Sequence, residues 1–438
     1  MKKTNLITIV ILSCLVLFGI FSCLSGEDGS EKEEYEDSLK LAQDYMSRGL
    51  YQLAIEQYDK AISIKDSEEL RDAEIEAYQK RYAESDKILS SYIDSVKNAN
   101  AKYNANVKYY ILLADLYIED GNYQSAYKCL KKAVDNGIEN SEVNSLLNKV
   151  KYFFKTDWST YDKFLPCTEE TYAVMNAERW SFIDENGNSK SSEEYSYVSQ
   201  IGDEGIRITA EEQAILEDEK NIVRGKLSFI PVSASIYSEG LIAINNGKSV
   251  GYYDSLGDFQ FGEFLYAGKF QNGKAPVKKT ENEWVLINKE GKELSSNKYQ
   301  DIKLDLNNGY ITNKIMIAKT GNLYSFFDES ENKIGSFTCE NIDVITDDGL
   351  IAFEQDKKWG FVNTKGEIII EPRYEDAKSF SNGLAAISQA GKWGFIDSNG
   401  VLVIDCQFFD ADYFNTQKSC MVKVDDAHWQ LISLVVDF

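Results

Sequence analysis

Residues 359–363 read Trp-Gly-Phe-Val-Asn, and residues 393–397 read Trp-Gly-Phe-Ile-Asp. The two segments lie 34 residues apart, and each is followed three residues later by a glycine, Gly366 or Gly400. A fixed period of this size is typical of repeat proteins, in which one small structural unit is copied along the chain. Repeated units build an extended surface more often than a catalytic cleft, so the pattern favours a binding function over an enzyme.

An aromatic or apolar anchor residue returns at nearly the same interval along the C-terminal part of the chain. Its positions are Trp180, a degenerate slot near Ala214, Val250, Trp284, Tyr324, Trp359, Trp393 and Trp429. A ring that keeps one place in every unit is expected to fill a repeated core position. We therefore predict that six aromatic residues are structural and not ligand contacts: Trp180, Trp284, Tyr324, Trp359, Trp393 and Trp429.

Alternating apolar residues between the anchors predict short antiparallel strands. In one unit these strands are Leu384–Ser388, Lys392–Ile396 and Val401–Ile404, and a tight turn rich in Asp, Asn and Gly joins the last two. The turns lack the alternating carboxylates and the distal glutamate of a calcium loop, so no metal site is predicted. A three-stranded meander cannot bury both faces alone, and neighbouring units must stack. Residues 157–438 are predicted to form an all-β repeat domain of short antiparallel meanders, either a propeller-like ring or an open array. A short fourth strand at Tyr374–Phe380 would favour the ring.

The best-preserved units resemble the WG-repeat family, which is named for its Trp-Gly pair. The segments that carry this resemblance are Lys358–Asn363, Lys392–Asp397, Ile370–Ala377 and Phe380–Ala385. The resemblance is strong over residues 349–409 and moderate over residues 240–349, and before that it depends on Trp180–Asp184 alone. It implies a repeat architecture and no particular activity, because the molecular roles of this family are poorly defined.

The N-terminal part of the chain has helical periodicity, with small residues at regular places. The apolar positions of two matching stretches are Leu39, Ala42, Tyr45, Ala54, Tyr58 and Ala61, then Leu113, Ala114, Tyr117, Ala126, Leu130 and Ala133. This spacing resembles the tetratricopeptide repeat, a helix–turn–helix unit of 34 residues, at Tyr35–Glu68 and Val107–Asn140. Residues 69–106 are interpreted as a divergent helical pair, and Ser141–Phe154 as the capping helix. Residues 34–156 are thus predicted to be an α-helical hairpin array, and the resemblance implies a protein or peptide partner.

The chain begins with Met1-Lys2-Lys3 and an apolar run from Leu6 to Phe21, which predicts an export signal over residues 1–22. The ending Ile20-Phe21-Ser22-Cys23 resembles the lipobox of bacterial lipoproteins, in which the cysteine is acylated. Cys23 is therefore the predicted lipid-attachment site, followed by a linker over residues 23–33. The alternative is an uncleaved N-terminal transmembrane anchor, because the apolar run is nearly long enough to span a bilayer. Both alternatives predict an extracytoplasmic protein on the outer face of a bacterial cell membrane.

Composition excludes several classes of function. The formal net charge of −24 repels nucleic acid phosphates, so we expect no nucleic acid partner. With the single histidine His428, histidine-based catalysis and multi-histidine metal sites are nearly excluded. The five cysteines beyond the signal have no paired spacing and are interpreted as buried apolar residues, with one opportunistic disulfide left open. The sequence contains no phosphate loop and no HExxH motif, and neither an enzyme nor a cofactor is predicted.

The sequence therefore favours a membrane-anchored scaffold that binds a protein or peptide through its repeat surfaces. The alternative is a carbohydrate or cell-wall binding module that would use the aromatics Tyr252, Tyr253, Trp284 and Tyr324. Exposure of those four rings would distinguish the two functions, because sugar stacking requires accessible ring faces. The identity of the partner cannot be obtained from the sequence.

Overall fold

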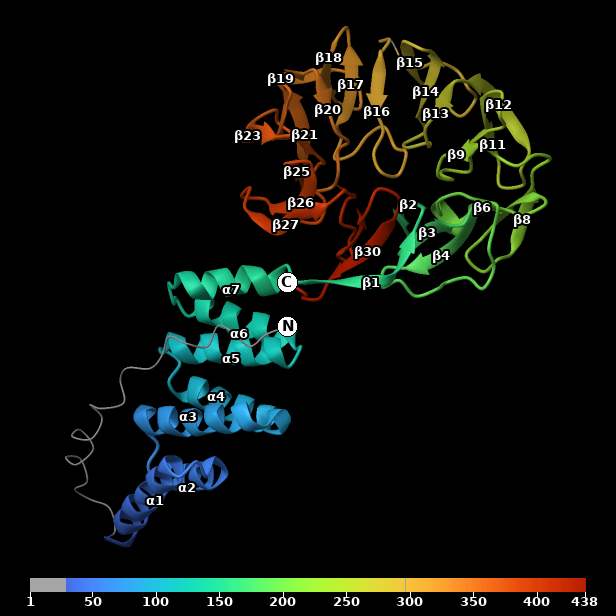
Figure 1. Ribbon diagram of the computed structural model, residues 1–438. Coiled ribbons are helices and arrows are strands. Elements are labelled where there is room, and N and C mark those ends of the chain that lie inside the picture. Colours follow the sequence, from blue (N-terminus) through green and yellow to red (C-terminus); the bar gives the residue numbers. More distant parts are fainter. Residues whose placement is uncertain (1–28, 296) are drawn as a thin grey trace. The chain divides into compact units, whose positions relative to one another are not determined.

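The computed structural model describes residues 29–295 and 297–438, which divide into two compact units after Lys151. Helices make up the first unit and strands make up the second, so the predicted order of α then β is confirmed (Figure 1). The sequence places the boundary at residue 156, whereas the last helix ends at Lys151 and the first strand begins at Phe154. The export segment 1–22 and Cys23 lie outside the described residues. Within the described ranges, no helix is both long enough and apolar enough to cross a membrane.

The helical unit contains seven α-helices within the described residues. They are α1 (Gly29–Ser47), α2 (Tyr51–Ile64), α3 (Glu68–Glu84), α4 (Leu89–Lys102), α5 (Val107–Glu119), α6 (Tyr123–Asp135) and α7 (Ser141–Lys151). Polar side chains cap several of the N-terminal ends. Ser67 Oγ accepts a hydrogen bond from the backbone N–H of Leu70, and Asn122 Oδ1 accepts one from Ser125. These bonds satisfy backbone donors that the first turn of a helix leaves unpaired.

Small residues set the close approach of the paired helices. Ala42, Ala54, Ala61 and Ala114 are fully buried, as the tetratricopeptide-like spacing predicts. In the first helical pair they pack in one apolar cluster with Tyr35 and other aromatic and aliphatic side chains of α1, α2 and α3. Because alanine occupies little volume, two backbones approach closely while larger neighbours fill the space around them.

The second unit is a β-propeller whose described residues form eight small antiparallel sheets, here called blades 1 to 8 in chain order. Blade 1 contains β2 (Lys163–Thr168), β3 (Thr171–Asn176) and β4 (Arg179–Asp184). Blade 2 contains β5 (Tyr197–Val198), β6 (Arg207–Ala210), β7 (Ala214–Glu217) and β8 (Val223–Lys226). Blade 3 contains β9 (Ser233–Ala234), β10 (Ile242–Asn245), β11 (Val250–Tyr253) and β12 (Phe259–Phe264). Blade 4 contains β13 (Tyr266–Ala267), β14 (Ala275–Thr280) and β15 (Glu283–Ile287).

The remaining blades continue around the ring. Blade 5 contains β16 (Asp301–Lys303), β17 (Met316–Thr320), β18 (Leu323–Phe327) and β19 (Lys333–Cys339). Blade 6 contains β20 (Asn341–Ile342), β21 (Leu350–Gln355), β22 (Lys358–Asn363) and β23 (Ile368–Tyr374). Blade 7 contains β24 (Asp376–Ala377), β25 (Leu384–Gln389), β26 (Lys392–Asp397) and β27 (Leu402–Phe408). Blade 8 contains β28 (Asp410–Ala411), β29 (Ser419–Lys423), β30 (Trp429–Leu434) and β1 (Phe154–Tyr161).

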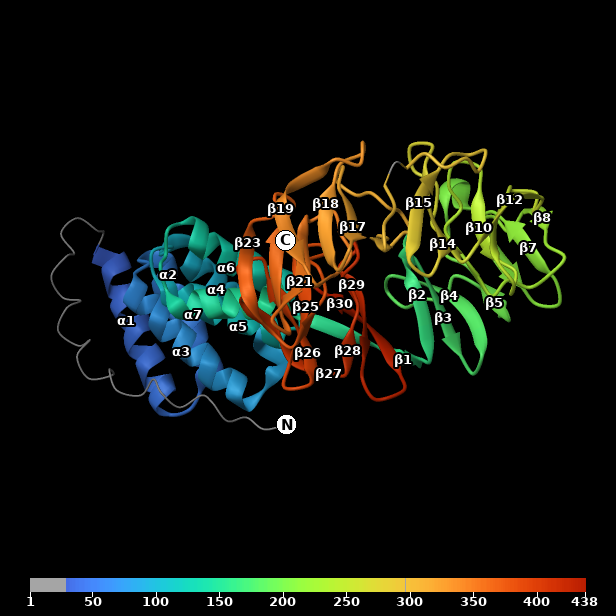
Figure 2. The ribbon, with the colours of Figure 1, turned by 90° about the horizontal axis from the view of Figure 1, so that it is seen from above.

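The ring is closed by pairing the two ends of the second unit. Strand β1 pairs antiparallel with β30, from Phe154 opposite Leu434 to Tyr161 opposite Trp429. Figures 1 and 2 both show the last strands, in red, beside β1. An apolar cluster fills the seam between blades 8 and 1 with Tyr161, Tyr172 and Met421, and each of the other seven seams among the described blades has its own cluster. Of the two arrangements that the sequence leaves open, the structure is therefore the ring.

The glycine of the Trp-Gly pair admits a neighbouring strand at close range. A Cβ atom at Gly360 would lie 2.5 Å from the carbonyl oxygen of Ile370, and one at Gly394 would lie 2.5 Å from that of Ile404. In both blades the register to the outer strand shifts at this position. The glycine thus accommodates a β-bulge that brings the outer strand against the core strand.

The sequence predicts three strands in each unit, but most blades have four. Most blades have a fourth strand of two or three residues at the start, such as β24 in the predicted segment Tyr374–Phe380. In blades 1 and 4 the place of an outer strand is taken by isolated bridges, such as Trp180 to Tyr195 and Trp284 to Tyr299.

Candidate functional site

A tight turn precedes the second strand of most blades, and in several of them it is a two-residue hairpin turn. In blade 7, Ser381 and Leu384 pair with each other around Asn382 and Gly383, which both have positive φ angles. Blade 4 has the equivalent turn at Asn272–Gly273, and blade 5 has it at Asn313–Lys314. Two positive φ angles define the type I′ turn, which favours Asn-Gly and matches the twist of the flanking strands. We call these turns and their counterparts in the other blades the axial turns.

Hydrogen bonds join the loops around the axis of each blade to those of the next blade. Among the described residues, each of the eight seams between blades has at least one such hydrogen bond. Asp203 accepts from Ser238 Oγ at 2.9 Å, and Glu239 accepts from the backbone N–H of Gly273 at 3.1 Å. Asp348 accepts from the backbone N–H of Gly383 at 2.7 Å. The remaining seams are joined by Thr168 to Ile201, Gln271 to Tyr310, Asn313 to Asp347, Asn382 to Phe414, and Asn415 to Tyr172. These hydrogen bonds fix the position of the axial turns, because a turn cannot move without losing hydrogen bonds to the neighbouring blade.

A hollow of about 420 Å³ opens among the axial turns. Its walls come from blades 1, 5, 6, 7 and 8, which meet only around the axis of the ring. Six carboxylates line it: Glu169, Glu170, Asp305, Asp347, Asp348 and Asp412. The described lining residues include no lysine or arginine. A second hollow of about 360 Å³ lies among the turns of blades 2 to 5 and has mixed charge, with Asp203, Glu239 and Glu329 beside Lys269 and Lys314. We call the two hollows together the axial mouth.

One ammonium group lies deep beside the acidic hollow. Lys378 Nζ is 3.7 Å from Asp412 and 3.8 Å from Asp410, and its side chain is 25% exposed. Burial would lower the pKa of Lys378, but the negative charges of Asp412, Asp410 and Asp343 outweigh it and raise that pKa overall. Burial raises the pKa of Asp412, and the Lys378 charge offsets part of this effect. The surroundings of Lys378, beside the acidic hollow, therefore favour a cation.

The aromatic residues singled out from the sequence lie in equivalent strands of six blades. Each pairs across to the outermost element of its blade: Trp180 with Tyr195, Trp284 with Tyr299, Tyr324 with Cys339, Trp359 with Tyr374, Trp393 with Phe408, and Trp429 with Tyr161. Trp284 and Tyr324 are 6% exposed. The other four are partly buried and pack against the seam clusters. None of the six lines either hollow of the axial mouth. That they stabilise the propeller stays a prediction, which a substitution can test.

The aromatics considered for carbohydrate stacking are buried. Tyr252 is fully buried, and Tyr253, Trp284 and Tyr324 are each 6% exposed. Their ring faces do not form an accessible surface. The most exposed tryptophan is instead Trp158 of β1, whose side chain is 98% exposed and which the sequence did not single out.

The described residues hold neither a disulfide nor a cluster of metal-ligating side chains. Cys129, Cys339 and Cys420 are buried, Cys167 and Cys406 are partly buried, and these five cysteines form no disulfide. Within the same ranges, no group of three His, Cys, Asp or Glu side chains is arranged to hold a metal ion. His428 lies at the surface beside Asp425, 2.9 Å away.

The axial mouth was missed by sequence reasoning, although a signal for it exists. The turn dipeptides Asn272-Gly273 and Asn382-Gly383 stand before strands in two units, and acidic residues stand at the same place in others. These positions form one surface only if the units close into a ring. The sequence does not decide between a ring and an open array, so it does not predict this surface.

Comparison with known families identifies both kinds of repeat. Residues 359–393 and 393–426 match the family described as WG containing repeat. Residues 107–136, which cover α5 and α6, match a tetratricopeptide repeat. The predicted combination of tetratricopeptide-type helices and WG repeats is therefore confirmed. No curated protein matches this chain.

Among solved structures, the chain is similar to the crystal structure of BamB from Moraxella catarrhalis. The two share 10% sequence identity with a TM-score of 0.46, and the match covers 64% of this chain and 98% of that chain.

Proposed function

We propose that this protein is a non-catalytic interaction protein, anchored outside the bacterial cytoplasm, whose axial mouth binds a positively charged segment of a partner protein. The observation that carries this proposal is the hollow of about 420 Å³ with six carboxylates around it. Its volume is in the range of pockets that hold small ligands, so it accepts a few side chains and not a folded domain. Lysine and arginine side chains combine a long apolar stem with a terminal charge, and they suit a narrow acidic opening.

The rigidity of the axial turns supports binding of a flexible segment. A site whose hydrogen bonds are already made loses little conformational entropy when a ligand enters. Four of the lining carboxylates, Glu169, Glu170, Asp347 and Asp348, belong to exposed residues and so remain accessible. The net charge of −24 adds long-range attraction for a basic partner and raises the rate of encounter at low ionic strength. The tetratricopeptide-type helices offer a second repeat surface for a protein partner.

A charge-neutralised variant tests the axial mouth. Replacing Glu169 with Gln and Asp347 with Asn should weaken binding of a fluorescein-labelled peptide of alternating Lys and Ala roughly tenfold, because two exposed charge pairs are lost. Fluorescence anisotropy at low and at physiological salt measures this affinity. The matched control replaces Glu263 and Glu340, which are exposed and outside both hollows, with Gln. Equal weakening by the two double variants would show a general charge effect and contradict the assignment of the site.

The anchoring part of the proposal depends on Cys23, which lies outside the described residues. The basic start, the apolar run and the lipobox-like ending support acylation at this residue. Replacing Cys23 with alanine should abolish metabolic labelling by a fatty-acid analogue and leave an unprocessed precursor. Undiminished labelling, or a wild-type protein that keeps residues 1–22, would favour the transmembrane alternative.

A further inference from the structure

Two carboxylates of the acidic hollow are open to a ligand. The other four have partners within the chain: Asp348 with the backbone N–H of Gly383 at 2.7 Å, Asp305 with that of Gly309 at 2.7 Å, Glu170 with Gln417 Nε2 at 3.2 Å, and Asp412 with Lys378 Nζ at 3.7 Å. The carboxylates of Glu169 and Asp347 have no hydrogen-bond or ion-pair partner among the described residues, and both residues are exposed. A positive charge on a ligand can therefore pair with both of them.

Two lysines without a partner line the second hollow, here called the mixed-charge hollow. Lys269 is partly buried and Lys314 is exposed, and neither ammonium group has an ion-pair or hydrogen-bond partner among the described residues. Two of the three carboxylates in this hollow are engaged, Glu239 with Lys289 at 3.1 Å and Asp203 with Ser238 at 2.9 Å, and that of Glu329 is open. Partial burial of an unpaired ammonium group is costly, and a carboxylate supplied by a ligand would remove that cost.

The two hollows meet at the axial turn of blade 5. Thr312 lines the acidic hollow, and the next two residues, Asn313 and Lys314, line the mixed-charge hollow. Asn313 Nδ2 donates a hydrogen bond to the backbone carbonyl oxygen of Asp347 in blade 6 at 3.2 Å. The open cation Lys314 and the open anion Asp347 thus lie on either side of one seam, and these two described residues form no ion pair with each other. One short extended segment, at about 3.3 Å per residue, can reach both hollows.

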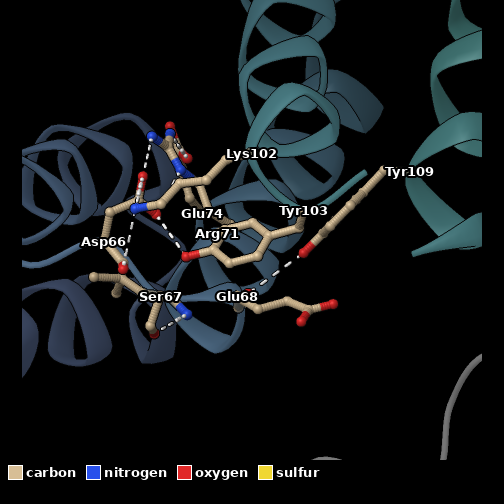
Figure 3. A network of polar contacts seen from close by, with 9 residues as sticks. Asp66, Ser67, Glu68, Arg71, Glu74, Lys102, Tyr103 and Tyr109 are labelled. Carbon is tan, nitrogen blue, oxygen red and sulfur yellow. Dashed lines mark hydrogen bonds and ion pairs between the residues drawn. The ribbon is translucent and has the colours of Figure 1, made fainter. Parts of the chain in front are cut away.

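A charged cluster in the helical unit has the opposite arrangement (Figure 3). Its Asp66 accepts from Arg71 Nη2 at 3.0 Å and pairs with Lys102 Nζ at 3.0 Å. The Tyr103 hydroxyl donates to the same carboxylate at 3.3 Å, and Glu74 pairs with Arg71 at 3.2 Å. These charges are satisfied within the chain, so the cluster stabilises helix contacts and offers no open charge to a ligand. The open charges of the axial mouth have no such partners.

We propose that the partner segment carries charges of both signs. Basic residues of the segment bind Glu169 and Asp347 in the acidic hollow, and acidic residues bind Lys269 and Lys314 in the mixed-charge hollow. This inference rests on the function proposed for the axial mouth and names the chemistry of the whole segment. The two halves also fix the direction of the segment, because the reversed segment would place like charges together. A purely basic segment would leave the two lysines unpaired.

Two labelled peptides of equal length test this inference on the intact chain. One has three Lys-Ala pairs followed by three Asp-Ala pairs, and the other has Asn in place of every Asp. Both are also made with the two halves in the reverse order. The net charge of −24 attracts the more basic Asn peptide in general, whereas the proposal predicts tighter binding of the Asp peptide. Fluorescence anisotropy at physiological salt measures the affinities.

In one of the two orders, the Asp peptide should bind the wild type about tenfold more tightly than its Asn counterpart, because two further ion pairs form. Replacing both Lys269 and Lys314 with Gln keeps most of each side chain and removes its charge, and this variant should lose the preference. The matched control replaces Lys248 and Lys333, which are exposed and outside both hollows, with Gln and should keep the preference.

An Asn peptide that binds as tightly as the Asp peptide in both orders would overturn the inference, as would an Asp preference that survives the loss of both lysines. The variant with Glu169→Gln and Asp347→Asn separates this failure from a failure of the proposed function. If that variant loses affinity for the Asn peptide while the Asp peptide has no advantage on the wild type, the mouth binds basic segments and the acidic residues of the segment are wrong. If none of the peptides binds the wild type, both proposals are wrong.

Discussion

Replacing Trp359 with alanine should lower the free energy of unfolding of the propeller by about 3 kcal/mol, the lower end of the range for truncating a core tryptophan. The lower end applies because the side chain is only partly buried. Trp359 packs against the seam between blades 6 and 7 and stands opposite Tyr374 of the outer strand. Urea unfolding followed by the fluorescence of the remaining tryptophans measures the change.

Trp158 provides the matched control for this substitution. Its side chain is 98% exposed, so Trp158→Ala removes the same atoms from a surface position and should leave the propeller stability almost unchanged. If Trp359→Ala unfolds like the wild type but loses affinity for a glycan or another ligand, the aromatic slot is a binding feature and the structural assignment is wrong.

Replacing Gly394 with alanine should cost about 1–3 kcal/mol, because the new methyl group has no space and the strands must separate. The added Cβ would lie 2.5 Å from the carbonyl oxygen of Ile404 and 2.7 Å from the backbone nitrogen of Cys406. Backbone atoms cannot rotate away as a flexible side chain can. The unfolding midpoint of the intact chain, followed by tryptophan fluorescence, gives the cost.

Gly391, in the hairpin just before Gly394, tests whether the cost comes from space or from backbone conformation. It has a φ of +71° and nothing near its missing Cβ. Asparagine tolerates this conformation better than other residues, so Gly391→Asn should change stability little. If Gly391→Asn proves as damaging as Gly394→Ala, the turn conformation limits stability, and the close approach of the outer strand does not.

Alternating polar and apolar residues and a regular period carried most of the information about the fold. The anchors Trp359 and Trp393 stand at equivalent places in their blades, and the Trp-Gly pair marks the bulge where two strands meet. The small residues Ala54 and Ala114 fall at helix contacts, as their spacing predicts. These features are local, because each depends on residues that lie within one repeat of each other.

The boundary of the helical unit and the strand number of each blade were harder to predict. The first strand of a blade, such as β24 with two residues, is too short to produce an alternating pattern. Blade 2 has no aromatic anchor, so its strands leave only a weak signal around Ala214. Strand β1 follows the last helix by a few residues, and only its pairing with β30 shows that it belongs to the last blade.

The sequence by itself determined the two kinds of repeat, their order, and the core positions inside each unit. This is because buried positions recur as a periodic pattern of apolar residues that lie close together in the sequence. Only the tertiary structure decided that the units close into a ring and that the turns of eight blades share one axial mouth. Each of these depends on contacts between residues that are far apart along the chain or belong to different elements. Closure brings Tyr161 to Trp429, and no pattern within a single repeat specifies that meeting.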